Sequence, residues 1–358
     1  MLSSLPPELI RDIIEATVPH TYHSTTYKSR QATLRSLSLV SRQFRDIAQP
    51  LLIEIVRTRT VAQLKRLDVA KDEPSGPKEL VVKCKNAAAR IEDLLDRWKG
   101  LQSFTIEYWG FEDSFDLGVL AQHSDLRNVE LANGQFECSV FRPFQTLRSL
   151  TFDDSALCPE LLRLLDPKVL PSLRSVGIKN IDNDAEVVAL EAESHLSRLL
   201  PQLEAINIQL DLYQLAKNGL FAGYSPRILI DVDYCMLNSA WLQSRPPIHH
   251  VRIIKVNGWT PDASKIVLKF IAAARTTETS ALESLYLDLS LHPSRVETPD
   301  LRLENERIVE ECKRGGIEVV FEVQPQNTDK YISEEFWSRQ RRRREKEQRT
   351  LKIGGKRS

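Results

Sequence analysis

The stretches LRNVEL (Leu126–Leu131), LRSLTF (Leu147–Phe152) and LRSVGI (Leu173–Ile178) carry the pattern that decides the fold of this chain. Each has apolar residues at its first, fourth and sixth positions, which is the alternation of a β-strand with one buried face. Further copies are LQSFTI from Leu101, LEAINI from Leu203 and LESLYL from Leu282, with weaker ones in PKELVV from Pro77, SPRILI from Ser225, IHHVRI from Ile248 and RGGIEV from Arg314. Successive copies begin 21 to 34 residues apart. The body of the chain is therefore predicted to be an array of similar units.

Helical stretches separate several of these strand phrases. They are expected at Cys158–Leu170, Asp184–Leu200, Asp262–Glu278 and Asp300–Arg314. One strand with one helix cannot bury its apolar face alone, so such units stack into a parallel sheet. The period and the phrase resemble leucine-rich repeats. The resemblance implies an α/β solenoid over residues 57–325, with parallel strands on the concave side and helices outside; a chance Leu-rich periodicity is the alternative.

A second pattern precedes the array, in LPPELIRDII (Leu5–Ile14) and LRSLSLVSRQFRDIAQPLL (Leu34–Leu52). Prolines suit the first turn of a helix, and the apolar residues after them recur as one stripe. In the second segment the apolar residues are Leu37, Val40, Phe44 and Ile47, while Arg35, Arg42, Arg45 and Asp46 fall on the solvated side. Pro50 is expected to end that helix. Two such helices are expected to be too small for a core of their own, which predicts a docking module.

These two segments together resemble the F-box, in the form found in fungal F-box proteins. The resemblance implies a small helical module over residues 1–56 that binds the Skp adaptor of cullin-based ubiquitin ligases. Carried over to this chain, the residues at the adaptor contact would be Leu5, Pro6, Leu9, Ile10, Ile13, Leu37 and Val40. Burying each large aliphatic side chain contributes about 1.5–3 kcal/mol. The alternative is a plain helical hairpin that only caps the next domain.

The third, fifth and seventh positions of each strand phrase are expected to face the concave side. There Arg227, His250 and Arg252 fall on neighbouring strands and form a candidate client-binding pocket for an acidic or phosphorylated peptide. The alternative is a solvated mixed surface in which Asp231 and Asp288 are the local counter-charges.

Composition argues against several other classes of protein. Lys and Arg together number 49, as do Asp and Glu, so the overall charge favours neither nucleic acid nor membrane as a partner. The five cysteines are scattered without a CxxC pair, which indicates reduced thiols in the cytoplasm or the nucleus, or both. No apolar run approaches the roughly 20 residues that span a bilayer.

The sequence also lacks the motifs of common catalytic and metal sites. It has no GxxxxGK[ST], GxGxxG, GxSxG or HExxH, and the His249–His250 pair would point to opposite faces of a strand. We therefore expect no catalytic residue, no metal, no cofactor and no enzymatic activity.

The function that these patterns favour is that of a substrate-recognition subunit, which holds the adaptor with its N-terminal helices and an unknown client with its repeats. One alternative is a leucine-rich-repeat scaffold with no connection to a ligase. Another is a nuclear, nucleic-acid-associated protein that uses the tail at residues 326–358, where ten basic and two acidic residues follow from Arg339 onward.

Overall fold

The computed structural model describes residues 6–18, 24–67, 76–84, 87–107, 114–139, 142–153, 159–179, 195–208, 229–233, 237, 249–254, 261–277, 280, 282–288 and 299–322. Within these residues the fold is mixed α/β, and its main element is a parallel sheet of eleven strands with β1 and β13 at its edges. In sheet order the strands are β1 (Ile55–Thr58), β2 (Glu79–Val82), β3 (Ser103–Glu107), β5 (Asn128–Ala132), β7 (Ser149–Asp153), β8 (Ser175–Lys179), β9 (Ala205–Ile208), β10 (Leu229–Asp233), β11 (His250–Ile254), β12 (Ser284–Asp288) and β13 (Glu318–Glu322).

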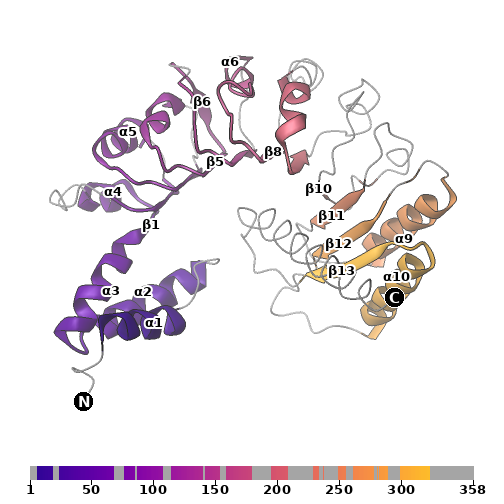
Figure 1. The fold of residues 1–358 in the computed structure, drawn as a ribbon, viewed down its shortest axis with the longest axis horizontal. Coiled ribbons are helices and arrows are strands. Elements are labelled where there is room, and N and C mark those ends of the chain that lie inside the picture. The colour runs from indigo at the N-terminus through magenta and orange to yellow at the C-terminus, as the bar shows by residue number, and fades with distance from the viewer. Residues whose placement is uncertain are drawn as a thin grey trace, which may run out of the picture.

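Each strand of this sheet pairs in parallel with the strand of the next unit, so the order in the sheet follows the order in the chain. Parallel neighbours need a crossover connection, and the helices described between the strands lie on one side of the sheet (Figure 1). Figure 1 shows the strands along the inner side of an arc and the connecting helices on its outer side. Those helices are α4 (Val61–Leu67), α5 (Ala88–Arg97), α6 (Pro159–Leu162), α9 (Pro261–Thr276) and α10 (Pro299–Arg314), with 3₁₀ turns η2 (Leu117–Gln122) and η3 (Leu200–Gln202).

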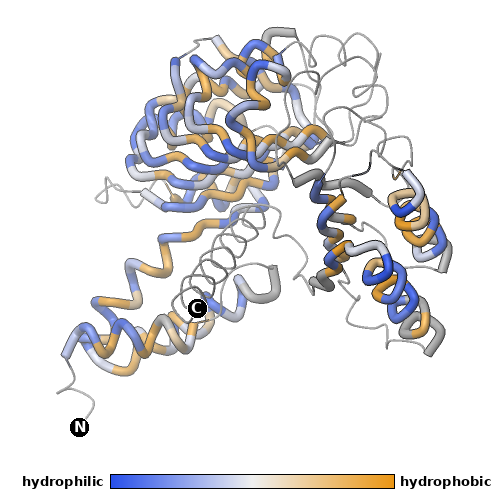
Figure 2. The backbone as a smooth tube through the Cα atoms, turned by 45° about the vertical axis from the view of Figure 1, so that its right-hand side comes forward, coloured by the Kyte–Doolittle hydropathy of each residue, from blue (hydrophilic) through white to orange (hydrophobic). Residues whose placement is uncertain are grey.

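The fourth and sixth residues of the strand phrases form the buried face of the sheet, which confirms the alternation predicted from the sequence. These side chains are at most 3 % exposed: Phe104, Ile106, Val129, Leu131, Leu150, Phe152, Val176, Ile178, Ile206, Val251, Ile253, Leu285 and Leu287. They belong to one continuous apolar core together with the leucines that open the phrases. Figure 2 shows the matching alternation of apolar and polar residues along the N-terminal strands.

One backbone interaction recurs from unit to unit just before the strands. The carbonyl of Gln102 accepts from the N–H groups of both Arg127 and Asn128, at 2.8 and 3.1 Å. The carbonyls of Lys78, Arg127, Arg148, Arg174 and His249 each accept in the same way from two consecutive N–H groups of the following unit. These six repeats of one geometry keep the strands in a constant register, in which Ser103, Asn128, Ser149, Ser175 and Ala205 lie in one row.

The register corrects the predicted frame of two weak copies. Leu229 pairs with Ala205 and His250, which are third-position residues, so the copy read from Ser225 begins two residues later. Likewise Glu318 pairs with Ser284, so the copy read from Arg314 also begins two residues later. The reason in the second case is a helix cap. Gly316 has φ +67°, and the N–H of Ile317 donates to the Cys312 carbonyl, so both glycines end α10 and do not begin a strand.

The predicted helices agree with the structure in the C-terminal part of the array and less well in the middle. Helices α9 and α10 confirm the stretches 262–278 and 300–314 to within two residues at each end. In the stretch 158–170 only the four-residue α6 is helical, followed by turns. Most of the stretch 184–200 lies outside the described residues; residues 195–199 are helical and lead into η3.

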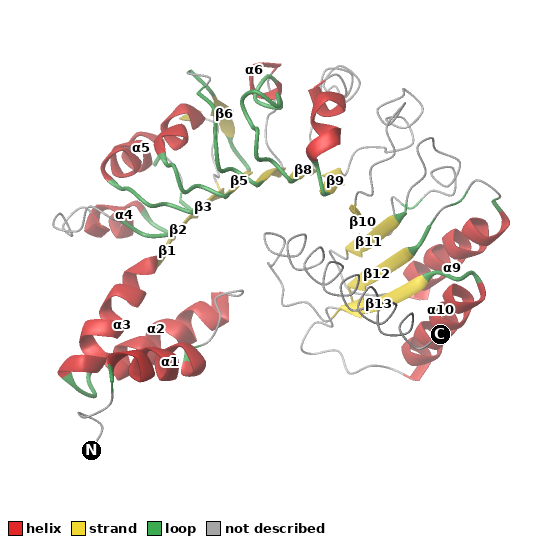
Figure 3. Ribbon diagram, in the orientation of Figure 1, coloured by secondary structure: helices red, strands yellow, loops and turns green. Residues whose placement is uncertain are grey.

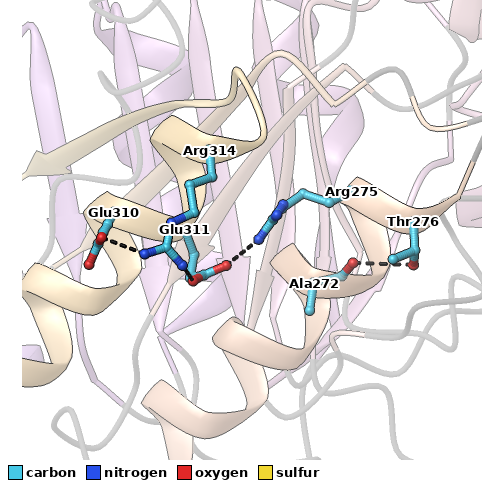
Figure 4. Close-up of polar contacts among 6 residues, drawn as sticks. All are labelled: Ala272, Arg275, Thr276, Glu310, Glu311 and Arg314. Carbon is cyan, nitrogen blue, oxygen red and sulfur yellow. Dashed lines mark hydrogen bonds and ion pairs between the residues drawn. The ribbon is translucent and has the colours of Figure 1, made fainter.

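Helices α9 and α10 are joined on the outer side of the sheet by charged groups, which Figure 4 shows. Glu311 accepts from Arg275 of α9 and, at 2.6 Å, from Arg314 of its own helix. Arg314 also pairs with Glu310. Glu311 is thus shared between two cations, and one of them holds the preceding unit against this one.

The N-terminal segment forms three helices, where two were predicted: α1 (Pro7–Thr17), α2 (Ser24–Ser38) and α3 (Arg42–Glu54). The segment expected to be a single helix is broken at Ser41, whose hydroxyl accepts from the N–H of Phe44 and caps α3. Pro50 lies inside α3 and does not end it. Helix α3 runs directly into β1, so the sheet begins one unit before the first predicted copy, and the predicted boundary at residue 56 falls within a strand.

Candidate docking surface

The three N-terminal helices have an apolar core of their own, separate from that of the sheet. It consists of Ile10, Ile14, Val18, Leu34, Phe44 and Ala48, with Leu37, Ile47, Leu51 and Leu52 packed around it. The prediction that these helices cannot form a core is therefore corrected, because α2 adds a third wall that the sequence pattern did not indicate. We call residues 6–54 the helical module; Figure 3 shows it as three packed helices next to β1.

The helical module nevertheless leaves large apolar side chains exposed. Leu9 and Ile13, one turn apart on α1, are 49 % and 40 % exposed, and Leu39 and Val40, in the turn between α2 and α3, are 79 % and 50 % exposed. In Figures 1 and 2 the start of α1 and the α2–α3 turn lie at the same end of the module. We call Leu9, Ile13, Leu39 and Val40 the apolar rim. Exposed apolar side chains gathered in one region are typical of protein-interaction sites.

The predicted adaptor contacts fall into three groups in the structure. Pro6, Leu9, Ile13 and Val40 are exposed, Leu37 is partly buried, and Leu5 lies outside the described residues. Ile10 is fully buried in the core of the module. Its assignment as a surface contact is corrected, since the side of the α1 stripe that holds Ile10 and Ile14 faces α3.

Leu39 is the rim residue that was not predicted. Its exposure follows from the chain break at Ser41, which turns Leu39 and Val40 out of both helices. The signal in the sequence is the serine itself, since a serine before a new apolar stripe is a preferred helix N-cap.

Charged groups join the helical module to the sheet. The carboxylate of Glu54, the last residue of α3, accepts from Lys78 Nζ at 2.7 Å and lies 3.4 Å from Arg30 of α2. The Arg57 guanidinium of β1 lies over the ring of Tyr27 of α2, 5.2 Å from its centroid. Five residues from α2, α3, β1 and the approach to β2 therefore meet at the junction.

The candidate client pocket lies only in part within the described residues. Arg227 lies outside the described residues, and the corrected frame moves it from the third position of its phrase to the first. In the sheet register Arg252 is flanked by Asp231 of β10 and Tyr286 of β12. His250 is 4 % exposed, and its Nδ1 lies 2.7 Å from the hydroxyl of Ser284. The register therefore places Asp231 and Arg252 at neighbouring positions of the sheet.

A group of acidic residues lies on the outer side, around the short parallel pair β4 (Ser114–Asp116) and β6 (Gln135–Glu137). Asp116 accepts from the N–H of Gly118 at 2.8 Å and from the N–H and hydroxyl of Ser139. Burial works to raise the pKa of Asp116, but these hydrogen bonds outweigh it and lower the pKa. Burial raises the pKa of nearby Glu92, whose carboxylate accepts from the Asp116 N–H at 3.0 Å. These contacts make Asp116 a structural link between two loops.

Among the residues that the structure describes, no cluster of His, Cys, Asp and Glu is arranged to hold a metal ion. Cys84, Cys138 and Cys312 are buried free thiols, and Cys158 and Cys235 lie outside the described residues.

The described helices include none that is both long and apolar enough to cross a bilayer. The basic tail at residues 326–358 lies outside the described part as well.

No protein-family model matches the sequence, and no curated protein matches it either.

Proposed function

We propose that this chain is the substrate-recognition subunit of a Skp–cullin–F-box ubiquitin ligase, with a leucine-rich-repeat solenoid as its client-binding body. The observation that carries the proposal is the apolar rim. Leu9, Ile13 and Val40 were assigned to the adaptor contact from the F-box-like motif, and all three are at least 40 % exposed on a module that already has its own core. These three side chains are not part of that core, so the packing of the module does not explain why they are apolar.

The size of the apolar rim agrees with a specific protein contact. Complete burial of one aliphatic side chain contributes about 1.5–3 kcal/mol, and these side chains begin about half exposed. Four of them therefore supply several kcal/mol on burial, which is enough for a docking site with Leu9 and Ile13 as its anchors.

The body of the chain supports the second half of the proposal. The repeated strand phrase, its constant register and the recurring double hydrogen bond to one carbonyl are those expected of stacked repeats. In the proposed mechanism the chain performs no chemistry. It holds a client near the ubiquitin-loaded enzyme, and the gain in rate comes from raised effective concentration.

The experiment that tests this function is co-purification of the full chain with a Skp adaptor. The double variant Leu9→Asp, Ile13→Asp places two carboxylates in the rim and should weaken binding at least a hundredfold, because two apolar anchors are lost. Both side chains are exposed, so the fold should persist, with an unchanged circular dichroism spectrum. Leu303→Asp is the matched control, since Leu303 is 58 % exposed on α10, far along the chain from the module. If the double variant still co-purifies, or if the unmodified chain does not, the proposed function is wrong.

A further inference from the structure

The surface next to Leu39 and Val40 carries more positive than negative charge. Arg35 in the last turn of α2 and Arg42 and Arg45 in the first turn of α3 are all exposed. The Arg45 Nε donates to the carbonyl of Ser38 at 3.3 Å, which holds this side chain across the turn. We call Arg35, Arg42 and Arg45 the arginine collar.

The collar has no acidic partner within the described part of the chain. From Ser24 to Asp46 the sequence holds five basic residues and one acidic residue, Asp46, which is exposed on α3. Arg30, one of the five, is compensated by Glu54 and only 12 % exposed, whereas no carboxylate among the described residues pairs with a member of the collar. In contrast, α1 carries Glu8 and Asp12 beside Arg11 on its exposed side. The two halves of the apolar rim therefore differ in charge.

We propose that the protein surface that docks on the apolar rim carries carboxylates opposite the arginine collar, so that acidic groups border the pocket that receives Leu39 and Val40. This inference rests on the proposed function and assigns the chemistry of the adaptor surface. Complementary charges at the border of an apolar contact steer the encounter and fix the orientation, while the buried apolar side chains set the affinity. A lipid surface is the less suitable occupant, because the carboxylates of α1 flank Leu9 and Ile13 and would be repelled by anionic headgroups.

The test is the association rate of the full chain with a purified Skp adaptor at two ionic strengths. The rate for the unmodified chain should fall about tenfold between low and high salt, because exposed charges are screened beyond roughly 10 Å at 0.1 M. Arg42→Glu should lower the low-salt rate by about tenfold and remove most of the salt dependence. Arg42 is the first residue of α3. The helix dipole stabilises a carboxylate at this position, so this variant should fold.

Lys28→Glu is the matched control for this charge reversal. Lys28 is exposed on the same helix as Arg35 but ten residues before the end of α2, which is about 15 Å along the axis. Its rate should stay within about twofold of that of the unmodified chain. Equal rates for Arg42→Glu and Lys28→Glu would overturn the inference while leaving the proposed function in place, provided that Leu9→Asp with Ile13→Asp still abolishes binding.

Two other outcomes would also overturn it. If the unmodified chain does not bind the adaptor, the inference and the proposed function fail together. If phosphatidylserine vesicles retain the unmodified chain but not Arg42→Glu, while both bind the adaptor at equal rates, the collar serves a lipid surface.

Discussion

His123 is a residue whose burial has a direct consequence for stability. It is 4 % exposed, follows η2, and neither ring nitrogen has a hydrogen-bond partner among the described residues. Burial lowers its pKa to about 4, and the charge of Lys99 adds to this effect against the opposing influence of Asp96. The folded protein therefore holds a neutral imidazole well below the pH at which an unfolded chain takes up the proton.

We expect the free energy of unfolding to fall as the pH is lowered from 6.5 toward 4. In this window the unfolded chain binds a proton at His123 and the folded chain does not, so the loss is on the order of 3 kcal/mol. Urea titrations at pH 7 and pH 5 would capture about 2 kcal/mol of this loss. In His123→Leu the drop should be much smaller; an equal drop in the variant would show that other groups cause the acid sensitivity.

Single residues also show where prediction from the sequence reaches its limit. Leu9 and Ile10 belong to one apolar stripe, yet one is half exposed and the other fully buried. A stripe is broad enough to face two surfaces, and its division depends on where α2 and α3 pack. The sequence indicated α1 correctly but not the third helix that makes this division.

At the scale of elements, the ends of helices depend on local features that the apolar periodicity does not reveal. Helix α3 continues through Pro50 because Leu51 and Leu52, which follow it, pack against the core of the module. The glycines at 315 and 316 were read as part of a strand but form the cap of α10. Strongly periodic elements such as α9 were predictable, since several buried residues specify them together.

The link between the loops around β4 and β6 leads to a prediction about Asp116. Asp116→Ala would leave the N–H groups of Gly118 and Ser139 without their acceptor and should cost about 1–2 kcal/mol of stability. Because the pKa of Asp116 is lowered from 3.8, this contribution is fully present above that pH and is lost below it. Denaturant midpoints at pH 7 would measure the change.

Asp125→Ala is the control for this substitution. Asp125 is exposed in the turn that follows η2, and its removal should change stability by less than about 0.5 kcal/mol. Equal midpoints for the two variants would contradict the assigned role of Asp116.

At the scale of the whole molecule, the parallel sheet was largely predictable and the surfaces were not. Core positions repeat from unit to unit. A misplaced frame in one copy therefore does not change the fold that the other copies predict. The client pocket depended on single positions in two neighbouring phrases, and the frame of one of these phrases differs by two residues from the predicted frame. The junction at Glu54 was also not foreseen, because its partners come from segments 24 residues away on either side.

The arrangement of the molecule separates the proposed adaptor-binding surface from the sheet. The apolar rim lies on a module with its own core at one end, and the strands line the inner side of the arc beyond β1 (Figure 1). A partner that occupies the rim would therefore contact the helical module and not strands β3 to β8.

The most direct test of this account is an amide hydrogen-exchange footprint of the full chain with and without a saturating Skp adaptor. The account predicts slower exchange in α1 and at residues 36–45, with no change in strands β3 to β8. Slower exchange in the strands, or unchanged exchange in α1, would contradict it.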